Sequence, residues 1–289
     1  MKPATGPTAT PRRPQRIRPL AGLTLLTALL LAAYLPIVMM VSMSLRESGR
    51  IYAHFWAPPW PLHPANYANA FAVLFGPTLN TLFICAVTVA GVLLLSTLAG
   101  YTFARMVFPG RSLLFGLVVA LMMTPGTLLL TPNYVLAVKL GLRDSYAGLW
   151  LFYISSSQVM GIFLMRSFFA ALPEELFESA RLDGAAEWQC LWHIAVPLCR
   201  PILVTVAIST TIAVYNDLIW PLLMITNPER ETLMQALLRF IPADRETTGR
   251  TDLGAVTAGY VCASLPIVLV FWIGMKTYIR GTLAGAVKG

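Results

Sequence analysis

The 289-residue chain has little charge. Aspartate, glutamate, lysine and arginine make up 12% of its residues, whereas 57% are hydrophobic. Soluble domains are about one quarter charged. A shortage this large excludes an ordinary soluble domain and predicts a chain that uses lipid as part of its solvent. The formal net charge of +8 does not indicate nucleic-acid binding, because the basic residues are spread over loops rather than gathered on one face.

Cysteine and histidine are also scarce, with four and three residues respectively. Cys190 and Cys199 flank His193, but a zinc site usually needs four ligands in paired spacings. We therefore interpret the cysteines as packing residues. The chain contains no G-x-x-x-x-G-K-[ST] phosphate loop, no H-E-x-x-H motif and no G-x-S-x-G motif. The sequence predicts no catalytic site, no metal site and no cofactor bound by this chain.

Six apolar runs are long enough to cross a membrane, since a helix needs about 20 mostly apolar residues to span the hydrocarbon. We predict an all-α polytopic membrane protein with six transmembrane helices. Pro125 and Pro132 fall in the third run and Pro266 in the sixth. We interpret these prolines as kinks inside a bundle, where neighbouring helices satisfy the freed carbonyls. The runs are residues 20–43, 79–104, 113–134, 146–168, 202–225 and 253–278.

The distribution of basic residues predicts that both termini are cytoplasmic. With that orientation, 13 of the 21 lysine and arginine residues fall in cytoplasmic segments and the other eight outside, as the positive-inside rule favours. The reverse orientation would place the strongly basic N-terminus outside. The predicted organisation is a disordered cytoplasmic segment 1–19, a transmembrane domain 20–280 and a cytoplasmic tail 281–289. The domain contains a polar cytoplasmic segment, 172–201, and an outer segment, 226–252.

Segment 172–201 has the pattern of two short amphipathic helices. Pro173, followed by two glutamates, makes a favourable helix start. Apolar residues then recur at spacings of three and four, and Gly184 permits a sharp bend between the two sets. The polar face is mostly acidic, whereas helices that rest on anionic lipid favour lysine and arginine. We interpret the segment as docking on another protein, with a helix resting on lipid as the alternative.

The same segment resembles the EAA–G–I-x-x-P loop of bacterial ABC importer permeases. Ser179 and Val196 depart from the pattern, replacing an alanine and a leucine. Residues 180–185 are similar to the carbohydrate-uptake branch of the family, as is the Y-N-D-L-I-W-P run at 215–221. Residues 284–289 resemble the terminus of its MalG-like subunit. The likeness covers about residues 20 to 289, and its central residues are Glu178, Ser179, Ala180, Gly184, Ile194 and Pro197.

The resemblance implies a type I ABC importer permease of the bacterial inner membrane, in which this loop forms a cytoplasmic coupling helix. Its implied partners are a dimer of ATP-binding subunits that hold ATP and magnesium, a second (MalF-like) permease subunit and a periplasmic or lipid-anchored solute-binding protein. The outer segment 226–252 would reach toward that binding protein, with Pro228 and Pro242 as expected helix breakers. The implied ATPase contacts are Glu178, Ser179, Ala180, Asp183, Gly184, Ala185, Ile194 and Pro197, with Lys288 and Gly289 as a second contact.

Polar residues inside two spans are candidates for a solute path. Asp217 is the only acid that we place within a span, where an ionisable side chain costs at least about 2.5 kcal/mol and normally faces protein or water. The fourth span has hydroxyls and an amide beside aromatics, which suit a sugar. Hydrogen bonding between helices is the alternative for both groups. The candidates are Tyr153, Ser156, Gln158, Tyr215, Asn216 and Asp217.

The function predicted from these features is a permease subunit of an ATP-driven importer for sugars, oligosaccharides or related polyols, working by alternating access. A permease for another solute, such as a glycerol-phosphate ester, is the alternative within transport. A membrane scaffold or membrane enzyme outside the ABC family is a third possibility. An enzyme would need convergent catalytic residues at one membrane depth, and the sequence shows none.

Overall fold

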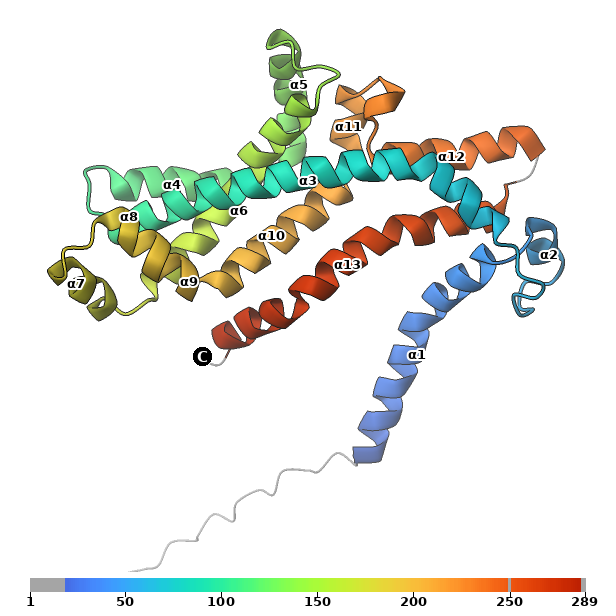
Figure 1. Cartoon of the computed structure of the whole chain (residues 1–289), viewed down its shortest axis with the longest axis horizontal. Coiled ribbons are helices and arrows are strands. Elements are labelled where there is room, and N and C mark those ends of the chain that lie inside the picture. Colours follow the sequence, from blue (N-terminus) through green and yellow to red (C-terminus); the bar gives the residue numbers. More distant parts are fainter. Residues whose placement is uncertain (1–18, 249–250, 287–289) are drawn as a thin grey trace, which may run out of the picture.

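A computed structural model of the chain describes residues 19–248 and 251–286, and side chains within residues 22–240 and 251–275. The described backbone is helical almost throughout and contains no strand, which confirms the predicted all-α class. Figure 1 shows the arrangement of the helices. The elements are α1 (Pro19–Ser44), α2 (Ser48–Ala53), α3 (Ala65–Arg105), α4 (Arg111–Met122), η1 (Gly126–Leu129), α5 (Leu130–Lys139), α6 (Tyr146–Ala170), α7 (Glu175–Leu182), α8 (Glu187–Gln189), η2 (Cys190–Ala195), α9 (Val196–Leu198), α10 (Arg200–Tyr215), α11 (Ile219–Met224), η3 (Pro228–Arg230), α12 (Leu233–Thr248) and α13 (Leu253–Ala286).

Four helices, α1, α3, α6 and α13, are long and apolar enough to cross a membrane unbroken. Two further candidates are bent pairs: α4 joins the η1–α5 unit at 95°, and the α8–α9 unit joins α10 at 77°. The described residues therefore hold four continuous spans, or six if each bent pair forms one span. The sequence prediction of six crossings falls at the upper end of this range and stays a prediction.

The 41-residue helix α3 runs along the long axis of the molecule (Figure 1), and several other helices pack against it. It packs against α6, α10, α12 and α13. Glycine lets α3 and α6 approach closely: a Cβ atom on Gly100 would lie 2.6 Å from the Cβ of Met165, and one on Gly161 would lie 2.9 Å from the Cβ of Ser96. Small residues serve this purpose between membrane helices, where packing replaces the hydrophobic effect.

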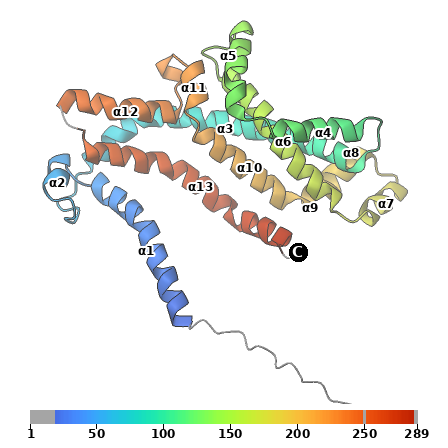
Figure 2. The same ribbon diagram turned by 180° about the vertical axis from the view of Figure 1, so that it is seen from behind.

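Helix α1 stands away from this bundle, as Figures 1 and 2 both show. It contacts α13, and its side chains between residues 22 and 38 are exposed. Leu31, for example, is 68% exposed. In a membrane such an apolar surface is covered by lipid or by another subunit.

The third predicted span is broken rather than kinked. Helix α4 ends at Met122, and Pro125 has an extended backbone (ψ 125°) that starts the turn η1. Proline has no backbone N–H and disfavours a helical conformation in the residue before it, so the chain turns through 95° here. Pro132 does not interrupt α5, because it lies in the first turn of that helix. Backbone N–H groups in a first turn have no intrahelical acceptor, so the lack of one in proline costs no helical hydrogen bond. Pro266 lies within a continuous α13 rather than in a loop, and the kink expected at this residue stays a prediction.

Two more expectations need correction. The predicted fifth span, 202–225, is divided: α10 ends at Tyr215 and α11 starts at Ile219. Asp217 therefore lies in a non-helical break, where its carboxylate accepts the Ile219 N–H at 3.1 Å and replaces helical pairing. The outer segment is largely a helix, since the backbone of α12 continues through Pro242. Helix α12 packs on α3 and α13.

Candidate functional site

Helix α7 and the α8–η2–α9 unit meet at a turn that depends on Gly184. Its φ of +86° is left-handed, a conformation that strains any residue with a Cβ atom. A Cβ here would have open space around it, so glycine is needed for its conformation rather than its small size. Beyond the turn, the Ala186 N–H donates to the side chain of Gln189 at 2.7 Å. The bend predicted at Gly184 is present.

Phe177 anchors α7 to the ends of two long helices. Its side chain is fully buried, and its ring centroid lies 6.3 Å from that of Tyr101 on α3. The ring of Phe169 on α6 also packs against Tyr101, edge to face, with the centroids 5.8 Å apart. The Arg105 guanidinium lies 4.3 Å above the Phe177 ring, within the range of a cation–π contact.

Five side chains form a continuous set of polar contacts around the same helix ends, which we name the ion-pair ring. Arg105 forms an ion pair with Glu174, which also accepts from Arg181 at 3.1 Å. Arg181 donates to Glu187 at 2.9 Å. The hydroxyl of Tyr101 donates to the other oxygen of Glu187 at 2.8 Å. Arg105 also donates to the carbonyls that end α6, those of Phe169 (2.6 Å) and Leu172 (2.5 Å).

The ring divides the acidic residues of this segment into two groups. Glu174 and Glu187 bond within the protein, so they contribute little to an outward acidic surface. Three other acids, Glu175, Glu178 and Asp183, are exposed, and in the described part of the chain their side chains have no ion-pair partner. The helical period of 3.6 places Glu175, Glu178, Ser179 and Leu182 on one side of α7, opposite Phe177. This surface, which we name the α7 face, is acidic with one apolar residue, Leu182, that is 89% exposed.

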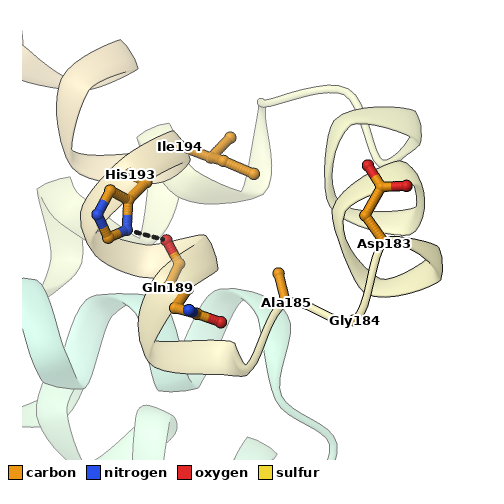
Figure 3. A pocket seen from close by; sticks show the side chains of 6 residues that line it. All are labelled: Asp183, Gly184, Ala185, Gln189, His193 and Ile194. Atoms are coloured by element: carbon orange, nitrogen blue, oxygen red, sulfur yellow. Dashed lines mark hydrogen bonds between the residues drawn. The ribbon is translucent and has the colours of Figure 1, made fainter.

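The residues predicted to contact an ATPase divide in the same way. Glu178, Ser179, Asp183 and Gly184 are exposed, whereas Ala180, Ala185 and Ile194 are partly buried against the core beneath. Pro197 is half-buried. A hollow of about 380 Å³ lies beside the turn, and Figure 3 shows the six residues around it. They are Asp183, Gly184, Ala185, Gln189, His193 and Ile194.

A second candidate site lies within the helices, where Tyr153 on α6 donates a 2.7 Å hydrogen bond to the carboxylate of Asp217. Both residues line a cavity of about 290 Å³, which we name the membrane cavity. Non-helical backbone at membrane depth is tolerated where it is buried or lines a cavity, and the break that contains Asp217 does line one. The lining residues are Gly126, Thr127, Leu130, Asn133, Phe152, Tyr153, Ser156, Asp217, Ile219 and Trp220.

Three of the six predicted path residues, Tyr153, Ser156 and Asp217, line the membrane cavity; the other three do not. Tyr215 is 2% exposed, and its hydroxyl donates to the Ala263 carbonyl at 2.7 Å, so it joins α10 to α13. The Asn216 amide bonds back to Ile212 at 2.9 Å. Gln158 on α6 is half-buried outside the cavity lining.

Sequence reasoning missed Thr127 and Asn133, which bring polar groups to the cavity from η1 and α5. The available signal was their position: both are polar residues in an apolar run, next to Pro125 and Pro132. The prolines were interpreted as kinks rather than as the borders of a cavity-lining turn.

Asp144 connects the loop before α6 to the segment after α11, and sequence reasoning missed this contact too. Its carboxylate accepts from the Thr226 hydroxyl at 2.7 Å, the Thr226 N–H at 2.5 Å and the Asn227 N–H at 3.1 Å. The hydrogen bonds from Thr226 lower the pKa of Asp144. Its own N–H donates to the Met224 carbonyl at 2.8 Å, and its φ of 54° is left-handed.

Residues 92–279 match the family of binding-protein-dependent transport system inner membrane components. The match covers more than half of the chain. The chain belongs to this family of ABC importer permeases.

The permease is also similar to individual proteins of known role. It is 31% identical over 259 residues to the trehalose transport system permease SugB of Mycobacterium tuberculosis, covering 89% of this chain and 93% of SugB. It is 34% identical over 227 residues to the maltodextrin transport system permease MdxG of Bacillus subtilis, covering 76% and 80% of the two chains. Its fold matches a crystal structure of a bacterial alginate-importing ABC transporter with a TM-score of 0.80, at 22% identity, over 94% of this chain and 99% of that one.

Family membership establishes what kind of subunit this permease is. Members are permease components of the inner membrane rather than enzymes, and a separate ATPase subunit drives them. This confirms the prediction of a transporter subunit. The two predicted tail contacts, Lys288 and Gly289, lie outside the described residues, as do residues 1–18 of the predicted N-terminal segment.

Proposed function

We propose that this permease imports a neutral sugar, oligosaccharide or related polyol through the membrane cavity. The observation that carries the proposal is the composition of that cavity. Hydroxyl and amide groups of Thr127, Asn133 and Ser156 line it together with aromatic rings. Phe152 and Trp220 lie with their ring centroids 5.0 Å apart. A sugar needs both kinds of group, for its hydroxyls and for its ring faces. The relatives that carry trehalose and maltodextrin support the same solute class.

The charge of the cavity favours a neutral solute over a phosphate ester. Asp217 carries its one carboxylate, and the lining residues include no lysine or arginine. A carboxylate repels an anionic solute most strongly where water is scarce and the dielectric is low. The glycerol-phosphate alternative is therefore disfavoured.

The α7 face is proposed as the surface that meets the ATPase. It combines the unpaired carboxylates of Glu175 and Glu178 with the exposed Leu182. Apolar residues beside unpaired charges suit a protein groove of opposite charge better than a lipid surface. This role requires α7 to be cytoplasmic, and with six crossings it places both termini on the same side. The ATPase dimer would hold the ATP and magnesium.

A second permease subunit and a solute-binding protein complete the proposed complex. The apolar side chains of α1 between residues 22 and 38 are exposed, so the rest of the chain does not cover this part of the helix. The family is named for its dependence on a binding protein, which would deliver the solute to the outer end of the molecule. Alternating access would then expose the membrane cavity to each side in turn.

Charge reversal on α7 tests the coupling role. The double variant Glu178→Lys/Asp183→Lys should reduce both co-purification of the ATPase and uptake, because two unpaired carboxylates are replaced by cations. Glu47→Lys is the matched control, since Glu47 is also exposed but lies between α1 and α2, away from the α7 face and the outer segment. Wild-type uptake in the double variant would exclude the α7 face as the ATPase contact.

The solute is identified by screening neutral oligosaccharides and phosphate esters for binding to the cognate binding protein. A preference for the esters would refute the neutral-solute proposal.

A further inference from the structure

The ion-pair ring begins and ends on the same turn of α3. Tyr101 and Arg105 are four residues apart, so their side chains leave one side of the helix. From Arg105 the contacts pass through Glu174 and Arg181 to Glu187, and Tyr101 closes the ring. The last turn of α3 is thus tied separately to the start of α7 and to the start of α8.

Arg105 is the most buried member of the ring's ion pairs. Its side chain is 6% exposed, compared with 35% for Arg181, 40% for Glu187 and 49% for Glu174. Its guanidinium ties together the end of α6, through the Phe169 and Leu172 carbonyls, and the start of α7, through Glu174. A planar guanidinium presents five N–H donors on three nitrogens in a fixed fork, whereas a lysine presents three donors from a single nitrogen.

The other half of α3 holds the outer segment by direct contacts. Asn80 donates to the Glu229 carbonyl at 2.9 Å and to the Glu231 carbonyl at 3.0 Å. The Thr81 hydroxyl accepts the N–H of Leu233, the first residue of α12, at 2.8 Å. Helix α3 is continuous from Asn80 to Arg105, a length of about 38 Å at 1.5 Å per residue. Figure 1 shows α7 and α12 toward opposite ends of this helix.

We propose that the ion-pair ring makes α7, α8 and α3 one rigid body, so that a displacement of α7 is carried along α3 to α12 at the outer end. Arg105 is the positioning residue of this unit: it contacts neither solute nor ATPase, and it fixes how α7 sits on α3. The proposal rests on the proposed role of α7 as the ATPase contact. It adds the route by which ATP binding or hydrolysis in the ATPase, on one side of the membrane, displaces α12 on the other side.

The proposal predicts that breaking the ring separates ATP hydrolysis from transport. In Arg105→Met the α7 face is unchanged, so the ATPase should still bind and hydrolyse ATP. Uptake per ATP hydrolysed should fall several-fold, because α7 can move without α3. Arg105→Lys keeps the charge and the pairing with Glu174 but loses the fork to two carbonyls, and should give an intermediate ratio. Arg200→Met is the matched control, because Arg200 is exposed at the start of α10 and lies outside the ring.

The ratio of solute uptake to ATP hydrolysis is measured on the complete complex of permease, partner permease, ATPase and binding protein in proteoliposomes. Spin labels on Leu176→Cys and Leu98→Cys, both exposed positions outside the α7 face, report the distance between α7 and α3. Cys262→Ser removes the one cysteine that is not buried. In the otherwise wild-type protein this distance should stay the same with and without ATP, and in Arg105→Met it should broaden. Tyr101→Phe removes one hydroxyl from the other end of the ring. It should also lower the ratio, so it keeps the test decisive if Arg105→Met fails to fold.

A wild-type ratio of uptake to hydrolysis in both Arg105→Met and Tyr101→Phe would overturn the proposal. A spin-label distance that changes with ATP in the wild-type background would do the same. Either result leaves the proposed ATPase contact intact, provided that the ATPase still co-purifies with the wild-type permease. Loss of that co-purification would instead refute the proposed function itself.

Discussion

The Tyr153 hydroxyl donates to Asp217 at 2.7 Å and so joins α6 to the break between α10 and α11. The other carboxylate oxygen of Asp217 accepts the Ile219 N–H at 3.1 Å. One acid therefore fixes the start of α11 and contributes the charge of the membrane cavity. Its position in a break explains how an ionisable group is accommodated at this depth: the carboxylate has two donors within the protein and lines a cavity.

Asp217→Asn should lower uptake about tenfold, because a hydrogen bond to a charged acceptor contributes about 1.5–3 kcal/mol. The amide can keep the Tyr153 contact but not the charge. Uptake is measured at saturating binding protein, with the melting temperature as a check on folding. Asn216→Ala is the control, because Asn216 is the neighbouring residue and lies outside the cavity lining. Full uptake by Asp217→Asn would show that the carboxylate has no part in transport.

Gly184→Ala should destabilise the turn after α7 by about 1 kcal/mol, because a left-handed φ strains alanine even where space is free. We expect weaker retention of the ATPase during washing, with little loss of overall stability. Gly49→Ala is the matched control: it too has open space at its Cβ position, and its φ lies outside the left-handed region. Equal retention by the two variants would contradict the role given to the turn.

Phe177→Ala should loosen the whole of α7. Removing a fully buried phenylalanine costs about 3–5 kcal/mol, and here it also removes the ring beneath Arg105. Limited proteolysis from the cytoplasmic side should then cut near residues 172–186 much faster than in the wild type. Leu182→Ala, at an 89% exposed position, should leave proteolysis unchanged and weaken ATPase binding. Equal protease resistance of Phe177→Ala and the wild type would count against Phe177 as the anchor.

The hydrogen bonds between the Asp144 carboxylate and Thr226 should persist at mildly acidic pH. Hydrogen bonds from Thr226 lower the pKa of Asp144 below its ordinary value of 3.8. A lowered pKa in the folded state means that the carboxylate stabilises the fold above the ordinary value, and that this stabilisation is lost as the pH falls through the folded-state value. Hydrogen exchange of the Thr226 and Asn227 amides should therefore stay slow at neutral and mildly acidic pH. Asp144→Asn should exchange faster than the wild type at every pH above the folded-state pKa of Asp144. Equal protection in the variant would show that the carboxylate does not stabilise this contact.

The helices and the bend at Gly184 could be predicted from the sequence because the signals for them are local. Apolar run length gives the spans, and a glycine between two amphipathic sets marks the turn. Local signals did not separate Glu174 and Glu187 from the other acids of the segment. That division depends on Arg105 and Tyr101, which are about 70 to 90 residues away in sequence.

The breaks were harder to predict for a related reason. Pro125 ends α4, whereas Pro132 and Pro242 lie within helices, and residue type alone does not distinguish these cases. Pro132 is tolerated because it lies in the first turn of α5, a position that is known only once the helix boundary is known. Asp217 was expected within a helix for a related reason: its bond to Ile219 is local, but its bond to Tyr153 appears only when α6 is placed beside the break.

The central claim, that this permease moves a neutral sugar when an ATPase acts on α7, is tested most directly by uptake in proteoliposomes. The complete complex is supplied with ATP, binding protein and a labelled neutral oligosaccharide that the binding protein recognises. The structure predicts accumulation that requires both ATP and binding protein, and that is lost in Glu178→Lys/Asp183→Lys but kept in Glu47→Lys. Accumulation that proceeds without ATP, or that survives the double reversal on α7, would contradict the claim.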